Sequence, residues 1–161
     1  MNTVAFTGYR PDKLPFVEDK KDEQYLKFRE RLLQVINRLV ERGYTDFISG
    51  VALGFDTWAA EDIIALKKEN KDIHLECAIP FPKQAERWEF FDRLRYKKIL
   101  RKADISTTLC EQYQSNAYFI RNEYMVDKAQ VVVALVNHNW GGAAKTLEYA
   151  KRKKKVIIEI K

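Results

Sequence analysis

Few residues of this chain belong to the types that build stapled, fibrous or membrane-spanning proteins. The 161 residues include two cysteines, six glycines and four prolines, too few for a disulfide framework, a fibrous repeat or a long flexible linker. No apolar run approaches the ~20 residues that cross a bilayer. The first eight residues have neither a basic leader nor an apolar run of signal-peptide length. We therefore expect a cytoplasmic protein with no membrane partner.

What the chain does contain is ordinary for a folded protein. Hydrophobic residues make up 46% and charged residues 32% of it, which predicts a single domain over residues 1–161. The net charge of +6 permits a polyanionic partner without identifying one. Much of the excess lies in residues 151–155 (Lys-Arg-Lys-Lys-Lys). We interpret this run as the cationic end of a helix, with a nucleic-acid patch as the alternative.

Apolar runs with strand character alternate with segments of helical periodicity along the whole chain. Expected strands cover residues 4–6, 46–48, 73–79, 104–109, 131–136 and 156–160. Expected helices begin near residues 22, 56, 117 and 143. This alternation predicts an α/β fold with a mainly parallel sheet and helices on both faces. Such sheets bind ligands beyond the carboxyl ends of their strands, so we looked for candidate sites there.

The first candidate loop, residues 7–11 (Thr-Gly-Tyr-Arg-Pro), follows the first expected strand. Gly8 allows the backbone to turn close to a ligand. Tyr9 can stack on a base, and Arg10 can offer a planar fork to a phosphate or carboxylate. The alternative is a plain turn with a solvated arginine.

The second candidate loop, residues 49–56 (Ser-Gly-Val-Ala-Leu-Gly-Phe-Asp), lies between an expected strand and a helix. Ser49, Gly50 and Gly54 can expose backbone N–H groups beside the positive end of the helix dipole, an arrangement that suits a phosphate. The pattern is neither a P-loop nor G-x-G-x-x-G. Asp56 is expected to cap the helix, either in a tight turn without a ligand or in addition to a role at the site.

A third candidate loop contains a glycine pair, Gly141 and Gly142, between the most apolar strand and the last helix. Two glycine loops at strand ends can hold one anion from two sides. Thr146 and Glu148 lie near the helix start, where a hydroxyl or carboxylate can meet a sugar or a leaving group. Trp140 can stack on a base or cover the core. The alternative makes Glu148 a surface residue.

The fourth candidate is the pair Arg121 and Asn122 in an expected helix over residues 117–129. An arginine in such a helix more often extends to solvent or pairs with a surface acid. It becomes a ligand-binding residue only if the helix directs it at the loops.

No metal site or cofactor is predicted. The two histidines are far apart in the chain, and we interpret His138 as a loop residue. Cys77 lies in an apolar strand and is expected to be a small buried hydrophobic residue rather than a nucleophile.

Several short motifs together resemble the YpsA-like family of the SLOG superfamily, which includes the Smf/DprA DNA-processing proteins and the Lonely Guy (LOG) enzymes. They are residues 7–11, residues 48–50 (Ile-Ser-Gly), residues 54–61 (Gly-Phe-Asp-Thr-Trp-Ala-Ala-Glu) and residues 121–128 (Arg-Asn-Glu-Tyr-Met-Val-Asp-Lys). The resemblance spans nearly the whole chain in the same order. It implies a single-domain modified Rossmann fold that binds a nucleotide or a nucleotide-derived ligand.

The resemblance also implies roles for individual residues, which are carried over position by position. Gly8 and Arg10 lie beside the ligand, Ser49, Gly50 and Gly54 form the phosphate loop, and Gly141, Gly142, Thr146 and Glu148 form the second glycine-rich loop. The LOG enzymes have Pro-Gly-Gly-x-Gly-Thr-x-x-Glu there. Here Trp140, Ala144 and Lys145 replace the Pro, the third Gly and the Thr, which weakens the expectation of phosphoribohydrolase activity more than that of binding.

Three hypotheses follow for function. The leading one is a sensor or regulatory protein that binds a small nucleotide-like molecule. The second is hydrolysis of the N-glycosidic bond of a nucleoside monophosphate, with Glu148, Asp56 and Arg121 as catalytic candidates. The third is single-stranded DNA binding. A homo-oligomer is also considered, through the aromatic residues between residues 88 and 96.

Overall fold

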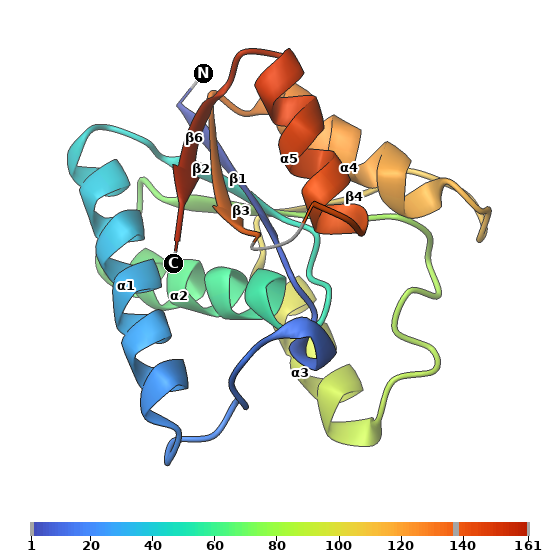
Figure 1. The fold of residues 1–161 in the computed structure, drawn as a ribbon, viewed down its shortest axis with the longest axis horizontal. Coiled ribbons are helices and arrows are strands. Elements are labelled where there is room, and N and C mark those ends of the chain that lie inside the picture. Colours follow the sequence, from blue (N-terminus) through green and yellow to red (C-terminus); the bar gives the residue numbers. More distant parts are fainter. Residues whose placement is uncertain (1, 137–138, 161) are drawn as a thin grey trace.

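The fold, described from a computed structural model, is built on one six-stranded parallel sheet (Figure 1). The structure describes residues 2–136 and 139–160. Every paired strand runs parallel to its neighbour, and the strand order is β4-β3-β2-β1-β5-β6. The strands are β1 (Thr3–Gly8), β2 (Asp46–Ser49), β3 (His74–Ile79), β4 (Ile105–Thr108), β5 (Val131–Leu135) and β6 (Val156–Glu159).

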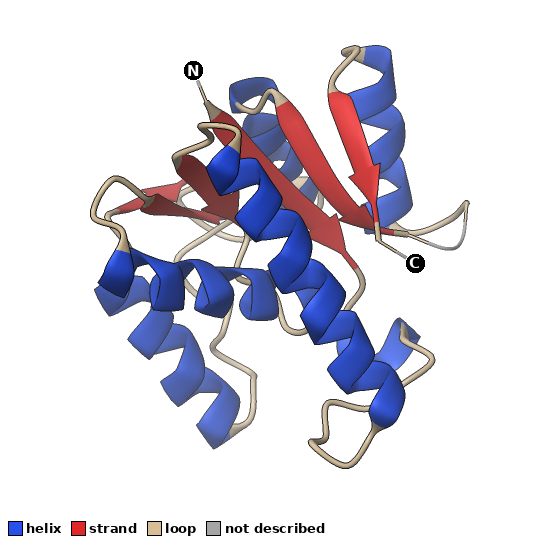
Figure 2. Cartoon of the chain, turned by 90° about the vertical axis from the view of Figure 1, so that its left-hand side faces the viewer, coloured by secondary structure: helices blue, strands red, loops and turns tan. Residues whose placement is uncertain are grey.

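Helices cover both faces of the sheet, so that the strands run between two helical layers (Figure 2). The helices are α1 (Glu23–Glu41), α2 (Phe55–Glu69), α3 (Phe90–Lys102), α4 (Ala117–Lys128) and α5 (Gly142–Arg152), with a short 3-10 turn η1 (Pro11–Lys13) after β1. The first three α-helices pack on one face, and α4 and α5 pack on the other. The predicted fold class, a parallel α/β sheet covered on both faces, is confirmed.

The two faces of the sheet carry side chains of different size, because side chains alternate along each strand. In β1, Val4 and Phe6 face the large apolar cluster under α1, α2 and α3, whereas Ala5 faces α4 together with Ile48 and Ala78. Successive strand residues point to opposite faces, so α4 packs against the face that carries Ala5, Ile48 and Ala78. The approach of α4 matters because this helix carries Arg121.

Local signals set the ends of α1. The Asp22 carboxylate accepts hydrogen bonds from the backbone N–H groups of Gln24 and Tyr25 and so caps the helix. Phe28, Leu32 and Ile36 are buried at helical spacing, so one face of α1 packs into the core. Gly43, just beyond the end of α1, has φ +95°, a conformation that favours glycine after a helix.

The chain changes direction across the sheet at β1 and β5. After β1 it moves to α1 on one face, and after β5 it moves to α5 on the other. The two departing loops therefore separate at the carboxyl ends of adjacent strands. Open α/β sheets bind ligands at such a switch point. Within the described residues, no helix is both long and apolar enough to cross a membrane.

Candidate functional site

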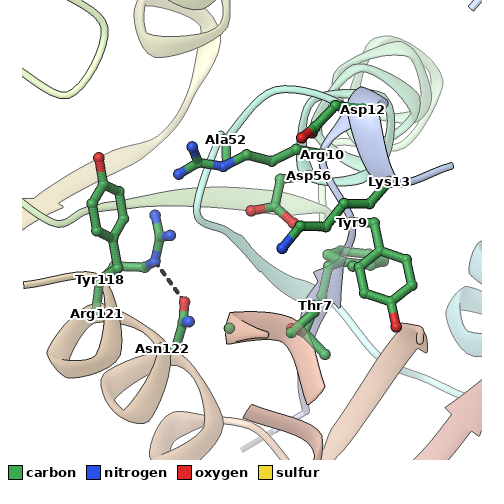
Figure 3. Close-up of a pocket in the computed structure, with 14 residues that line it drawn as sticks. Thr7, Tyr9, Arg10, Asp12, Lys13, Ala52, Asp56, Tyr118, Arg121 and Asn122 are labelled. Carbon is green, nitrogen blue, oxygen red and sulfur yellow. Dashed lines mark hydrogen bonds between the residues drawn. The ribbon is translucent and has the colours of Figure 1, made fainter. Parts of the chain in front are cut away.

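A cavity of about 360 Å³ opens at the switch point, beyond the carboxyl end of β1 (Figure 3). Four segments form it: the end of β1 with the η1 turn, the loop and first turn of α2, the first half of α4, and the start of α5. Its lining consists of Phe6, Thr7, Gly8, Tyr9, Arg10, Asp12, Lys13, Ala52, Asp56, Tyr118, Arg121, Asn122, Gly142 and Ala143. The structure thus brings residues of all three predicted loops and the Arg121 helix to one place.

Two glycines hold the β1 loop against the start of α2. A Cβ on Gly8 would lie 2.4 Å from the Phe55 ring, so only glycine allows this contact. Gly54 has φ +89°, and a Cβ there would lie 2.7 Å from the Tyr9 carbonyl oxygen. The Phe55 N–H donates to that same carbonyl over 3.3 Å. These contacts fix the distance between Arg10 and the helix N-terminus.

Ser49 and Gly50 lie behind the cavity and do not line it. Ser49 is fully buried. Its hydroxyl donates to the Asp56 carbonyl oxygen (2.8 Å) and accepts from the Val51 N–H (3.1 Å). Val51, a non-glycine residue, has φ +53°. Ser49 therefore stabilises the conformation of the loop between β2 and α2 through these two buried hydrogen bonds.

Asp56 is the second residue of α2, and the prediction that it caps this helix is wrong. Gly54 occupies the N-cap position. The Asp56 side chain instead lines the cavity, with 8% of the residue exposed. Its Oδ1 is buried and has no hydrogen-bond partner among the described residues. Burial raises the pKa of this carboxyl to about 6, against the opposing effects of Arg121, the Ala52 backbone N–H and Arg10.

Arg121 of α4 is a buried cation held by backbone oxygens. Its Nη1 donates to the carbonyl oxygens of Gly50 (2.8 Å) and Ala78 (3.3 Å) and to Gln84 Oε1 (3.4 Å). Its Nε donates to Asn122 Oδ1 over 2.8 Å. The residue is 4% exposed, and burial lowers the pKa of its guanidinium. These bonds fix the guanidinium in position, so it acts on the cavity as a stationary positive charge.

Two further cations lie on the β1 side of the cavity, where they are more open to solvent. The Arg10 guanidinium stands 5.3 Å from the centre of the Tyr118 ring, and Arg121 approaches the same ring to 5.8 Å. Lys13 Nζ stands 5.1 Å from the centre of the Trp140 ring. Figure 3 shows these side chains around the cavity with Asp56 and Arg121: Arg10 and Lys13 come from the segment after β1, Asp56 from α2 and Arg121 from α4.

The second glycine-rich loop enters the site only with its first helical residues. Gly142 and Ala143 line the cavity, while Gly141 precedes them with φ +93°. The Thr146 hydroxyl is buried and donates to the Gly142 carbonyl oxygen over 2.9 Å. Glu148 is exposed, and it does not belong to the cavity lining.

Two more predictions concern the same loop. Trp140 is 56% exposed and reaches the site through its contact with Lys13. His138 lies outside the described residues.

Sequence reasoning missed three polar residues of the lining: Asp12, Lys13 and Tyr118. Asp12 and Lys13 follow Pro11 in a segment without periodicity, so nothing in the sequence aims them at the loops. Tyr118 precedes Arg121 by three positions, which places both on one side of a helix. This three-residue spacing is the sequence signal that indicates Tyr118 as a further residue of the site.

The arrangement suits an anionic ligand that also carries hydrogen-bond donors. Arg10, Lys13 and Arg121 are cations, and α2 presents the positive end of its dipole. Asp56 and Asp12 are the acidic groups of the lining. Among the described residues, no group of three histidine, cysteine or acidic side chains is placed to hold a metal ion.

The fold is similar to that of two solved DNA-processing proteins. DprA from Streptococcus pneumoniae aligns with a TM-score of 0.63 and 18% identity, covering 98% of this chain and 49% of that protein. DprA from Helicobacter pylori, solved for its single-stranded DNA binding mode, aligns with a TM-score of 0.64 and 18% identity. This chain spans 64% of the second protein, so it corresponds to only part of each.

Sequence comparison points to a narrower group. A UPF0398 protein of Halalkalibacterium halodurans is 31% identical over 157 residues, covering 95% of this chain and 82% of the relative. A UPF0398 protein of Bacillus thuringiensis strain Al Hakam is 29% identical over 157 residues, covering 96% and 84%. The YpsA profile, described as the YspA SLOG family, matches residues 4–158. The chain therefore belongs to the YpsA family of the SLOG superfamily.

Proposed function

We propose that this protein binds a small nucleotide-like anion in the cavity at the switch point and acts as a sensor or regulatory protein. The observation that carries the proposal is the convergence of Arg10, Lys13 and Arg121 on a cavity at the N-terminus of α2. Helix N-termini favour phosphates because their dipole and amide groups point at the ligand.

The size of the cavity argues for a mononucleotide. Small-molecule pockets span ~300–1,000 Å³, and about 360 Å³ lies near the lower limit of that range. In the proposed complex the phosphate contacts Arg10 and Lys13 near the α2 N-terminus, and Arg121 adds charge from the opposite wall. Tyr118 offers an aromatic edge to the base or sugar.

A thermal-shift panel of nucleoside monophosphates, NAD, ADP-ribose and cyclic nucleotides tests the proposal. A ligand at ~100 times its Kd stabilises the fold by ~2.7 kcal/mol, which raises the Tm of a chain this size by about 5–10 °C. Arg10→Gln is expected to remove the shift. The matched control is Arg101→Gln, because Arg101 is exposed on α3 and is not part of the cavity lining. A panel without any shift contradicts the proposal.

Hydrolysis of the N-glycosidic bond is a second candidate, favoured by the carboxyl of Asp56 with its pKa near 6 at the cavity wall. In this mechanism Asp56 takes a proton from a water molecule whose oxygen bonds to the anomeric carbon, the N-glycosidic bond breaks, and the released base takes up that proton. Glu148 is exposed on α5 and does not line the cavity, so Asp56 replaces it as the leading candidate for the catalytic carboxylate. Chromatography of nucleotide incubated with enzyme checks this: Asp56→Asn is expected to stop base release and Glu148→Gln to preserve it.

Single-stranded DNA binding is a third candidate, and a cluster of exposed cations favours it. Lys68, Lys98 and Arg101 surround Lys102 and lower its pKa by repulsion, with Lys68 the largest contributor. A fluorescent oligonucleotide should then bind more weakly as salt rises, and Lys98→Gln with Lys102→Gln should reduce affinity. Salt-independent binding, or none, removes this candidate.

The homo-oligomer considered from the sequence, like residence in the cytoplasm, stays a prediction. Phe90 and Phe91 at the start of α3 are 59% and 79% exposed, and their rings pack against each other at 5.4 Å. Trp88 packs instead against Tyr96, within the molecule. Light scattering on the wild-type chain and on Phe91→Ser tests whether this surface joins two copies.

A further inference from the structure

The cavity wall contains a carboxylate oxygen whose hydrogen bonding is incomplete. Asp56 is 8% exposed, and its Oδ1 has no partner among the described residues. The Oδ1 atom is itself closed off from solvent, so bulk water does not satisfy it. A buried acceptor without a donor costs free energy. A ligand that brings a donor to this carboxylate therefore gains more than the same hydrogen bond gives in water.

The neighbouring cations do not supply that donor. The Nη1 and Nε of Arg121 are bonded to oxygens of other residues. Arg10 lies over the Tyr118 ring. Both arginines lower the pKa of Asp56 through their charge. The Ala52 backbone N–H donates a hydrogen bond to the Asp56 carboxylate. The Asp56 carboxylate lines the cavity, so a ligand donor reaches it from that side, and the broad χ2 torsion of aspartate lets the carboxylate turn to meet the donor without moving the backbone.

The chemistry of a nucleotide limits which part of it can face Asp56. An ionised phosphate has only acceptors and carries the same charge sign as the carboxylate, so it belongs on the side of Arg10 and Lys13. Ribose hydroxyls are donors that every ribonucleotide shares, whatever its base. They are joined to the phosphate through a single carbon and the sugar ring, which matches a small cavity with cations and a carboxylate on its walls.

We propose that Asp56 is the specificity residue that accepts a hydrogen bond from a ribose hydroxyl, so that this cavity selects ribonucleotides over their deoxy analogues. The inference rests on the proposed function of nucleotide binding at this site. It also distinguishes the cavity from a DNA site. An internal deoxynucleotide has no free sugar hydroxyl, and a DNA strand laid here would leave the Asp56 carboxylate without a donor.

Calorimetry on matched ligands tests the inference. The ligands are AMP, GMP, CMP and UMP, each paired with the 2′,3′-dideoxy monophosphate of the same base, with 2′-deoxy and 3′-deoxy forms separating the two hydroxyls. Wild-type protein is expected to bind a ribonucleotide at least tenfold more tightly than its dideoxy partner. In Asp56→Ala this ratio is expected to fall close to one, because the acceptor is gone.

Asp56→Asn provides the second variant. It keeps an oxygen acceptor of the same shape and loses the charge, so the ratio should lie between those of the wild type and Asp56→Ala. Urea unfolding of both variants verifies that they are folded, and if the alanine variant is not, the asparagine variant alone decides by lowering the ratio or leaving it unchanged.

Each remaining outcome has one meaning. A wild-type ratio near one overturns the inference while the proposed function stands, since nucleotides still bind. A ratio above ten that persists in both variants also overturns it, because another group then recognises the sugar. If no ribonucleotide binds at all, the proposed function fails and the inference fails with it.

Discussion

Arg121 packs directly against the α-carbon of Gly50. Its Nη1 donates to the Gly50 carbonyl oxygen over 2.8 Å, and a Cβ on Gly50 would lie 2.5 Å from the same nitrogen. This contact joins the loop after β2 to α4, two segments 71 residues apart. It also explains why this loop needs glycine at a position where the backbone itself is not strained.

Replacing Gly50 with alanine is expected to displace the guanidinium and destabilise the fold by about 1–3 kcal/mol, the usual cost of overpacking a tight site. The matched control is Gly142→Ala, because a Cβ at Gly142 meets nothing within 4 Å. Urea unfolding midpoints measure both. Equal stability of the two variants would contradict the packing described for Arg121.

The two arginines of the site should differ in their effect on stability. Arg121→Gln removes charged hydrogen bonds to two buried carbonyl oxygens and is expected to cost about 2–4 kcal/mol. Arg10→Gln removes an exposed side chain over Tyr118 and is expected to cost less than about 1 kcal/mol. The prediction is wrong if chemical denaturation gives both variants the same loss.

Asp56 should make the folded state less stable as pH rises from about 4 to 6. Its pKa is about 6 in the fold against 3.8 in the unfolded chain, so within this window the native state holds a proton that the unfolded state has released. Above pH 6 this costs about 3 kcal/mol at most. Asp56→Asn is therefore expected to be more stable than the wild type at pH 8 and about equal to it at pH 4.

The quantity to measure is the difference in unfolding free energy between the two proteins across that range. Glu76 and Asp104 have lowered pKa values, and both lose their contribution at lower pH. They are present in both proteins, so they cancel in the difference. A difference that does not change with pH would show that Asp56 titrates as an ordinary carboxyl.

The fluorescence emission of Trp140 is expected to report ligand binding at the cavity. Of the three tryptophans, Trp58 is fully buried and Trp88 is half-buried, whereas Trp140 is 56% exposed beside Lys13. A nucleotide phosphate that draws Lys13 away from the ring is expected to change the emission of Trp140. Trp140→Phe should lose the change but keep the ligand-induced rise in Tm, and a signal that survives in this variant would assign it to another tryptophan.

The sequence predicted the location of the site better than the direction of its side chains. Strand ends and glycines are local features of the sequence. They correctly indicated that the loops containing Gly8 and Gly54 lie at the same edge of the sheet. Glu148 was placed by its distance from the glycine pair. Whether it faces the cavity depends on how α5 packs, and Leu147 and Ala150 turn that face to the sheet and leave Glu148 exposed.

Tertiary packing also decided the roles of Ser49 and Asp56. A serine after a strand can turn either to a ligand or to its own backbone, and only the closed loop selects the second. Asp56 resembles an N-cap in sequence. Gly54, with its positive φ, takes the N-cap position two residues before Asp56, and the Asp56 carboxylate then lines the cavity.

The position of β1 in the sheet has a consequence for synthesis. β1 precedes the other five described strands in the chain, yet one of its two neighbours is β5, and Val4 pairs with Val131, 127 positions later. The central strand is therefore complete only when most of the chain has been made. Non-local pairing of this kind slows folding, and a nascent chain that ends before β5 exposes an open strand edge. Fragments truncated after α4 should accordingly aggregate.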